Sequence, residues 1–155
     1  MNMPASSALA RLPPFDQICF VVPDMQAALD LYAPLFGPFM VLENGPFESV
    51  CRGRKAMVDM IVAFGRSGAV EVELVQPLSG PLPHRDFLDA GHAGIQHLRY
   101  SVEDLHGWQR KLEALGYAEV WAGSYPATPG TRAISWVYLQ RADDPVLVEL
   151  VEFGA

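Results

Sequence analysis

The sequence predicts an α+β fold built from two tandem copies of one βαβββ module. Residues 15–36 align without a gap with residues 95–116 at an offset of 80, which places Gln17 on His97. Residues 70–76 (VEVELVQ) align with residues 146–152 (VLVELVE) at an offset of 76. Within each half, the same order of strand-like and helix-like patterns recurs. Self-similarity at a fixed offset is typical of a duplicated structural unit.

The first module is expected over residues 15–77. It opens with an apolar run rich in Ile, Val and Phe, which predicts a strand over 15–22. Asp24 is a helix N-cap candidate, and the apolar spacing that follows it predicts a helix over 25–35, ended by Pro34 and Gly37. The remaining strands are expected over 39–43, 56–64 and 70–76, with a turn at 66–68.

The second module is expected over residues 95–153 and repeats this order. A strand over 95–102 and a helix over 103–115 come first, followed by strands over 117–122, 133–140 and 146–153. A linker rich in Pro and Gly, residues 78–94, joins the modules and is expected to hold one short helix around 85–89. Residues 1–14 are expected to form a loose N-terminal arm, so the chain is one structural domain with an arm.

Composition narrows the class of protein. The chain has 155 residues, half of them hydrophobic, and a net charge of −7. An acidic chain lacks the basic face that nucleic acid or an anionic membrane requires, so neither partner is expected. No segment approaches the ~20 apolar residues of a membrane span, and the N-terminus does not resemble a secretion signal. Cys19 and Cys51 form no metal-binding motif, and a reducing, cytoplasmic location is expected.

Four polar residues occupy matching positions in the two modules. Gln17 and His97 lie on the first strands, and Glu73 and Glu149 lie on the last. Both faces of the strand around Glu149 are apolar, so this carboxylate is expected to be buried, which is costly unless it is paired, protonated or bound to a metal. Each residue taken singly could be a hydrogen-bonded core residue. Their duplication instead indicates a four-ligand metal site between the halves.

Further residues on the predicted strands are candidates for the wall of an apolar substrate pocket: Met57, Met60, Trp121, Trp136 and Tyr138. Arg99 shares a strand face with His97 and could pair with an acidic substrate group or with a neighbouring Glu. Ordinary core packing is the alternative for each aromatic residue and Met. His84, His92 and His106 are expected in solvated positions, and Glu48 and Glu71 are weaker candidates for a base.

The chain resembles the vicinal oxygen chelate superfamily, which includes glyoxalase I, methylmalonyl-CoA epimerase, extradiol dioxygenases and bleomycin-resistance proteins. The segments QICFVVPDMQAALDLY, VEVELVQPLSG, GIQHLRYSVEDL and VLVELVE carry this resemblance, which covers residues 14–153. It implies a cupped, partly open mixed β-sheet with helices outside, a divalent metal held by Gln17, Glu73, His97 and Glu149, and a homodimer. The sequence around FLDAGHAGIQHL is similar to the epimerases, whereas Gln at position 17 is similar to some glyoxalase I enzymes.

The resemblance implies a metal-dependent isomerase or lyase that moves a proton next to a carbonyl or thioester of a small substrate. Zn²⁺, Ni²⁺, Co²⁺, Mn²⁺ and Mg²⁺ all suit a mixed oxygen and nitrogen site. Glu149 is the first candidate for the catalytic base, with Glu73 as the base on the opposite face. A metal-free small-molecule binding or resistance protein is the alternative. An extradiol dioxygenase ranks last, because such enzymes prefer two histidine ligands and only His97 occupies a ligand position.

Overall fold

The computed structural model describes residues 11–154. Most of the arm expected over residues 1–14 therefore lies outside the described residues. The elements follow in chain order: β1 (Gln17–Val21), α1 (Met25–Phe36), β2 (Met40–Leu42), β3 (Phe47–Cys51), β4 (Arg54–Ser67), β5 (Val70–Ser79), α2 (Pro83–Asp89), β6 (Gly94–Ser101), α3 (Leu105–Glu113), β7 (Ala118–Tyr125), β8 (Ile134–Gln140) and β9 (Leu147–Phe153).

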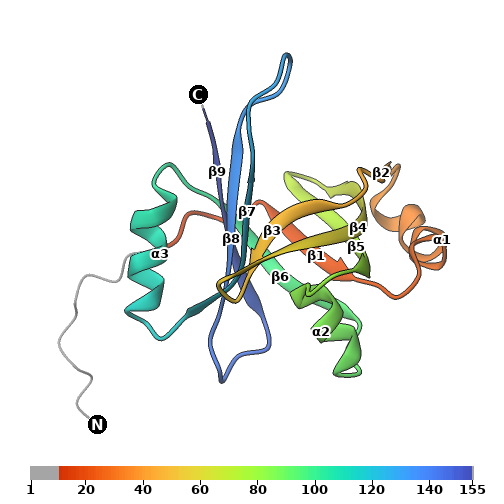
Figure 1. Cartoon of the computed structure of the whole chain (residues 1–155). Coiled ribbons are helices and arrows are strands. Elements are labelled where there is room, and N and C mark those ends of the chain that lie inside the picture. Colours follow the sequence, from red (N-terminus) through yellow and green to blue (C-terminus); the bar gives the residue numbers. More distant parts are fainter. Residues whose placement is uncertain (1–10, 155) are drawn as a thin grey trace, which may run out of the picture.

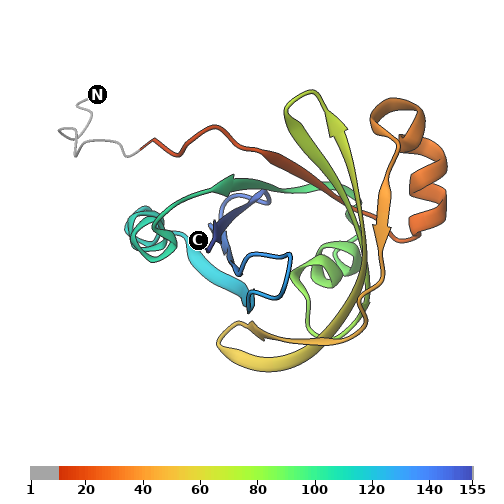
Figure 2. The same cartoon turned by 90° about the horizontal axis from the view of Figure 1, so that it is seen from above.

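The described strands form one mixed sheet that curls round on itself (Figures 1 and 2). Pairing runs from β1 through β5, β4, β3, β7, β8, β9 and β6 and returns to β1. The contact between β3 and β7 spans two residue pairs, Val50 with Ala122 and Cys51 with Trp121. Helices α1 and α3 lie outside the sheet on opposite sides of the molecule (Figure 1). The expected cupped α+β fold is confirmed.

Strand register reproduces the duplication seen in the sequence. Strands β1 and β6 are antiparallel, and Ile18 pairs with Leu98, its own counterpart at the offset of 80. A pseudo-twofold axis therefore passes between the two strands at this pair. The same operation relates the parallel pairing of β1 with β5 to that of β6 with β9. The two modules thus pair within a single chain.

Both outer helices begin with the same pair of caps. The Asp24 carboxylate accepts a hydrogen bond from the Ala27 backbone N–H, and the Asp104 carboxylate accepts one from the Gly107 N–H, each at 2.8 Å. A side chain of the module's last strand caps each helix a second time: Gln76 accepts from Met25 N–H and Glu152 from Leu105 N–H, both at 2.7 Å. Each helix is thereby fixed to the strand that carries Glu73 or Glu149.

We expect Asp104→Ala to lower the free energy of unfolding by about 1 kcal/mol, because one helix N–H loses its partner. Urea denaturation measures the change. Glu103→Ala is the matched control, since Glu103 is exposed and precedes the cap. Equal losses in the two variants would show that the cap does not stabilise α3.

One strand of the first module differs from its expected position. The module's second strand is β3, Phe47–Cys51, which pairs with β4 and β7. The strand expected over 39–43 exists as β2, Met40–Leu42, but it is an additional strand that pairs with the outer part of β4. Local apolar content favoured residues 39–43, whereas β3 forms a hairpin with β4 across a two-residue turn and pairs with β7, which is distant in the sequence.

Helix α2 closes one end of the curled sheet, where it contacts β1 and β5. Phe87 and Leu88 of this helix pack against Cys19, Val21 and Val75. In the described part of the chain, no helix is long and apolar enough to cross a membrane. Through Phe87 and Leu88 of α2, the linker contributes to the core around Cys19.

Candidate functional site

The four duplicated polar residues converge inside the curled sheet. Gln17 and His97 come from the central strands β1 and β6, and Glu73 and Glu149 come from the flanking strands β5 and β9. All four are buried, with exposed fractions between 0 and 8%. His97 Nε2 lies 3.1 Å from Glu149 Oε2 and 3.5 Å from Glu73 Oε2. The pseudo-twofold axis therefore brings donors from both modules to one point.

Three oxygens of this cluster have unused hydrogen-bonding capacity. Gln17 Oε1, Glu73 Oε2 and Glu149 Oε2 are buried and accept no well-directed hydrogen bond from the described residues. A single N–H at His97 Nε2 cannot satisfy two carboxylates. Ligand atoms bound to one metal ion at about 2.0–2.2 Å lie about 3 Å apart, which is close to the observed separations from Nε2. The separations from Nε2 therefore suit a divalent metal ion, and the group whose ligand atoms all lie within 4.8 Å of one another comprises Cys19, Glu73 and His97 and does not include Glu149.

Neighbouring side chains fix the orientation and charge of His97. Its Nδ1 lies 3.1 Å from Gln96 Oε1, and Gln96 Nε2 donates to the Pro83 carbonyl at 3.0 Å. The amide oxygen of Gln96 therefore faces Nδ1–H. Nε2 lies beside the carboxylates and 3.3 Å from the Tyr138 hydroxyl, which is its hydrogen-bond partner. Burial alone would lower the pKa of His97, but the Glu149 and Glu73 carboxylates beside Nε2 and their negative charges outweigh burial and raise the pKa to about 9.

Glu149 and Cys19 are also perturbed by this environment. Burial raises the pKa of Glu149, opposed by His97 and reinforced by the negative charge of Glu73. The Cys19 thiol, from the same face of β1 as Gln17, lies with Glu73 and His97 in a group whose ligand atoms are all within 4.8 Å of one another. Burial and then the charge of Glu73 raise the pKa of Cys19. The sequence predicted a buried thiol but not its place beside the donors, although its position two residues after Gln17 indicates a shared face.

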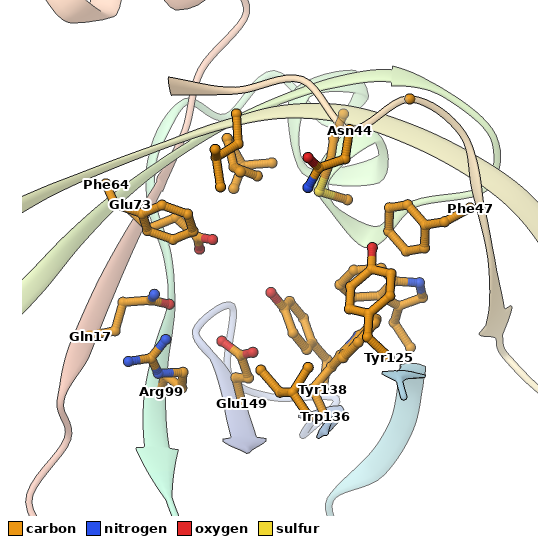
Figure 3. Close-up of a pocket in the computed structure, with 17 residues that line it drawn as sticks. Gln17, Asn44, Phe47, Phe64, Glu73, Arg99, Tyr125, Trp136, Tyr138 and Glu149 are labelled. Atoms are coloured by element: carbon orange, nitrogen blue, oxygen red, sulfur yellow. The ribbon is translucent and has the colours of Figure 1, made fainter. Parts of the chain in front are cut away.

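A cavity of about 200 Å³ opens beside the cluster. Figure 3 shows Gln17, Glu73 and Arg99 together on one side of the cavity, Glu149 at its floor, and Phe47, Tyr125 and Trp136 on the other side. Asn44, from the loop between β2 and β3, faces this floor from across the cavity. The cavity thus pairs two carboxylates with an aromatic wall, which excludes water from part of the space.

Five of the six residues expected to line the pocket do so: Met60, Arg99, Trp121, Trp136 and Tyr138. Met57 does not, because it is 56% exposed and pairs with exposed Glu48 on the outer face of the sheet. Arg99 is bound by two carboxylates, Asp16 at 2.8 Å and Glu71 at 3.3 Å. The sequence left open whether Arg99 pairs with an acidic substrate group or with a neighbouring Glu. The structure shows it paired with neighbouring acidic side chains.

Several residues near the site were missed or misplaced, among them Phe47, Tyr125 and His84. Phe47 and Tyr125 line the cavity, and Phe47 could have been found from the alternation of Phe47, Ser49 and Cys51 along the unrecognised strand β3. His84 was expected in a solvated position but is fully buried, with ring centroids 5.4 Å from Trp121 and 5.5 Å from Tyr138. Helix α2 carries it beneath the site. His92 and His106 are exposed, as expected.

The fold agrees with a family match. Residues 16–135 match the family described as the glyoxalase/bleomycin resistance protein/dioxygenase superfamily. The chain belongs to this superfamily. The match includes the strands that carry Gln17, Glu73 and His97 and ends before Glu149. No curated protein gives a significant match.

Solved structures support the same fold. A methylmalonyl-CoA epimerase from Mycobacterium tuberculosis superimposes with a TM-score of 0.59 at 24% identity, covering 97% of this chain and 94% of that one. A hypothetical protein from Bacillus halodurans gives 0.60 at 20% identity, covering 90% and 93%. A 4-hydroxymandelate synthase variant from Streptomyces coelicolor gives 0.56 at 20% identity, covering 99% of this chain and 53% of that one. At these identities the similarity establishes the fold.

Proposed function

We propose that this protein is a divalent-metal-dependent isomerase or lyase that moves a proton beside the carbonyl or thioester group of a small substrate. The observation that supports the proposal is the convergence of Gln17, Glu73, His97 and Glu149 at the polar side of an apolar cavity. A structural cluster of buried charges would be expected to satisfy its own hydrogen bonds, whereas three oxygens of this cluster do not.

The same four residues would hold the metal. Gln17 Oε1, one oxygen each of Glu73 and Glu149, and His97 Nε2 supply a mixed oxygen and nitrogen set that suits Zn²⁺, Ni²⁺, Co²⁺, Mn²⁺ or Mg²⁺. When bound, a divalent ion polarises a carbonyl oxygen and stabilises the negative charge that develops on it as the adjacent C–H loses its proton. A homodimer stays a prediction from the family resemblance, and a cytoplasmic location stays a prediction from the cysteine content.

Glu149 is the base that we assign to the proton transfer. It lines the cavity, and burial raises its pKa in the metal-free chain. A positioned carboxylate of this kind can act as a general base. Glu73 also lines the cavity and is related to Glu149 by the pseudo-twofold axis. Two carboxylates that approach one carbon from different sides suit epimerisation, in which one base removes the proton and the other returns it to the opposite face.

The cavity size favours a small reacting group. Its volume of about 200 Å³ lies below the ~300–1,000 Å³ of pockets that enclose drug-sized ligands. A short acyl chain fits beside the carboxylates, while a larger carrier would extend beyond the cavity. Structural neighbours named methylmalonyl-CoA epimerase support an acyl thioester as the first substrate class to test.

The test measures metal content by mass spectrometry in the purified protein and in a Glu73→Ala/Glu149→Ala double variant. About one divalent ion per chain in the wild type, lost in the double variant, is expected. Glu48→Ala/Glu119→Ala removes two carboxylates outside the cluster and is the matched control. The metal-loaded protein is then screened for exchange of the α-proton of acyl-CoA epimers and of glutathione hemithioacetals in D₂O. A wild type that binds none of the five metals would overturn the proposal.

One observation favours a metal-free binding protein as a second candidate. With its pKa at about 9, His97 in the metal-free chain carries a positive charge at neutral pH and partly compensates Glu73 and Glu149. The cluster can therefore persist without an ion. Ligand binding that survives exhaustive chelation, together with no metal uptake, would select this second function.

A further inference from the structure

A chain of charged groups extends behind Gln17. Gln17 Nε2 donates a hydrogen bond to Glu71 Oε1 at 2.7 Å, and Arg99 Nη1 donates to the same oxygen at 3.3 Å. Arg99 Nε donates to Asp16 Oδ1 at 2.8 Å, and Asp16 Oδ2 accepts from the Ser101 backbone N–H at 3.2 Å. Glu71 is thus held between the Gln17 amide and a guanidinium that is itself anchored to β1 and β6.

This arrangement determines which end of the Gln17 amide faces the cluster. An ionised carboxylate only accepts hydrogen bonds, so the amide atom 2.7 Å from Glu71 must be the NH₂ group. The carbonyl oxygen then points the other way, where it is buried and accepts no hydrogen bond from the described residues. A flipped amide would present NH₂ to the site, and NH₂ has no lone pair to offer a metal.

The duplication shows that the fold alone does not require this network. Its counterparts in the other module are different in kind: Gln96 matches Asp16, Leu147 matches Glu71, and Cys19 matches Arg99. On that side the donor is His97, whose ring is already oriented by Gln96. The charged network therefore occurs beside the donor that needs an orienting partner, the amide.

We propose that Glu71 is a positioning residue that holds the Gln17 amide with its oxygen toward the metal, with Arg99 anchoring Glu71, an inference that rests on the proposed metal-dependent function. Arg99 then supports the orientation of Gln17 through Glu71. It does not act as a free cation for an acidic substrate, because Asp16 and Glu71 already compensate its charge. Outer partners that orient a ligand typically contribute 10–100-fold to metal affinity.

The first test compares Glu71→Leu with Glu71→Gln by titrating the metal-free protein with Co²⁺ in a calorimeter. Leu is the residue of the matching position, Leu147, and it leaves the Gln17 NH₂ without an acceptor. We expect the Kd for Co²⁺ to rise about 10–100-fold in Glu71→Leu. In Glu71→Gln it should stay within about threefold, because the Gln carbonyl still accepts the hydrogen bond. Equal losses in both variants would show that Glu71 acts through its charge and would overturn the proposal.

The second test is a double-mutant cycle with Gln17→Ala. If Glu71 acts through the Gln17 amide, Glu71→Leu should raise the Kd by less than about twofold in the Gln17→Ala background. The same loss in both backgrounds would overturn the proposal, because the effect would then come from the released Arg99 or from a change in folding. Glu48→Leu, which removes an exposed carboxylate from β3, is the control for non-specific charge effects.

A third measurement separates failure of this inference from failure of the proposed function. In the metal-free protein, the side-chain NH₂ of ¹⁵N-labelled Gln17 should exchange slowly with solvent and shift on Glu71→Leu but not on Glu48→Leu. If the wild type binds no metal, the proposed function fails, while this resonance still decides whether Glu71 holds the amide. A Gln17 resonance that does not change in Glu71→Leu overturns the positioning role whether or not metal binds.

Discussion

Glu149→Gln is expected to lower the rate of substrate proton exchange by about 10²–10⁴-fold, the contribution typical of a positioned general base. The substitution keeps the shape of the side chain and one carbonyl oxygen but removes the group that accepts the proton. Glu149 lines the cavity, and burial raises its pKa in the metal-free chain. The amide cannot replace this function.

Metal content should fall only partly in the same variant, because Gln17, Glu73 and His97 remain and the new carbonyl can still bind. Turnover is measured by NMR as deuterium exchange of whichever acyl thioester or hemithioacetal the wild type accepts, with metal content measured on the same sample. Glu48→Gln, an exposed carboxylate on β3, is the matched control and should retain full activity. Full activity of Glu149→Gln would remove Glu149 from the mechanism.

The sequence predicted the four candidate ligands because of the internal duplication. A shared offset places Gln17 and His97 on equivalent strands, and the pseudo-twofold axis between Ile18 and Leu98 makes these strands adjacent. Periodicity alone would not have distinguished Glu73 from its neighbour Glu71, which lies on the same strand face. The repeat distinguished them, because Glu73 has an acidic counterpart in the second module and Glu71 has Leu147.

What the sequence did not reveal depended on distant partners. Strand β3 joins the second module only through its pairing with β7, and because β3 was not recognised, Phe47 was not placed in the cavity. Met57 and Met60 are three positions apart, so their side chains point to opposite faces of a regular strand and could not both line the cavity. His84 lies in a linker rich in Pro and Gly, and no local pattern indicates that α2 folds back beneath the site.

The metal-free protein is expected to lose stability as the pH rises from about 6.5 to about 9. The pKa of His97 is raised above its unfolded value by Glu149 and Glu73, so the folded state binds the proton more tightly. The resulting stabilisation is fully present below the unfolded pKa of about 6.5 and is lost as the pH passes through about 9. At 1.36 kcal/mol per pKa unit its size is about 3 kcal/mol.

Urea denaturation after chelation, at about pH 6 and about pH 9.5, measures this loss. His97→Gln should remove most of the difference, whereas His106→Asn, which changes an exposed histidine, should retain it. A metal-free stability that does not change over this range would show that His97 is neutral among the carboxylates.

Metal binding should reverse this dependence, because the ion and the proton compete for His97 Nε2. Below the folded pKa of about 9, each unit of increasing pH should strengthen the apparent metal affinity by about tenfold, and above it the affinity should level off. Calorimetry in buffers of different ionisation enthalpy counts the released proton. If affinity is independent of pH between about 6.5 and 9, then His97 is not a ligand. Suppose that the stability of the metal-free protein falls with rising pH while the metal affinity rises. This result would identify His97 Nε2 as the atom that binds both the proton and the metal.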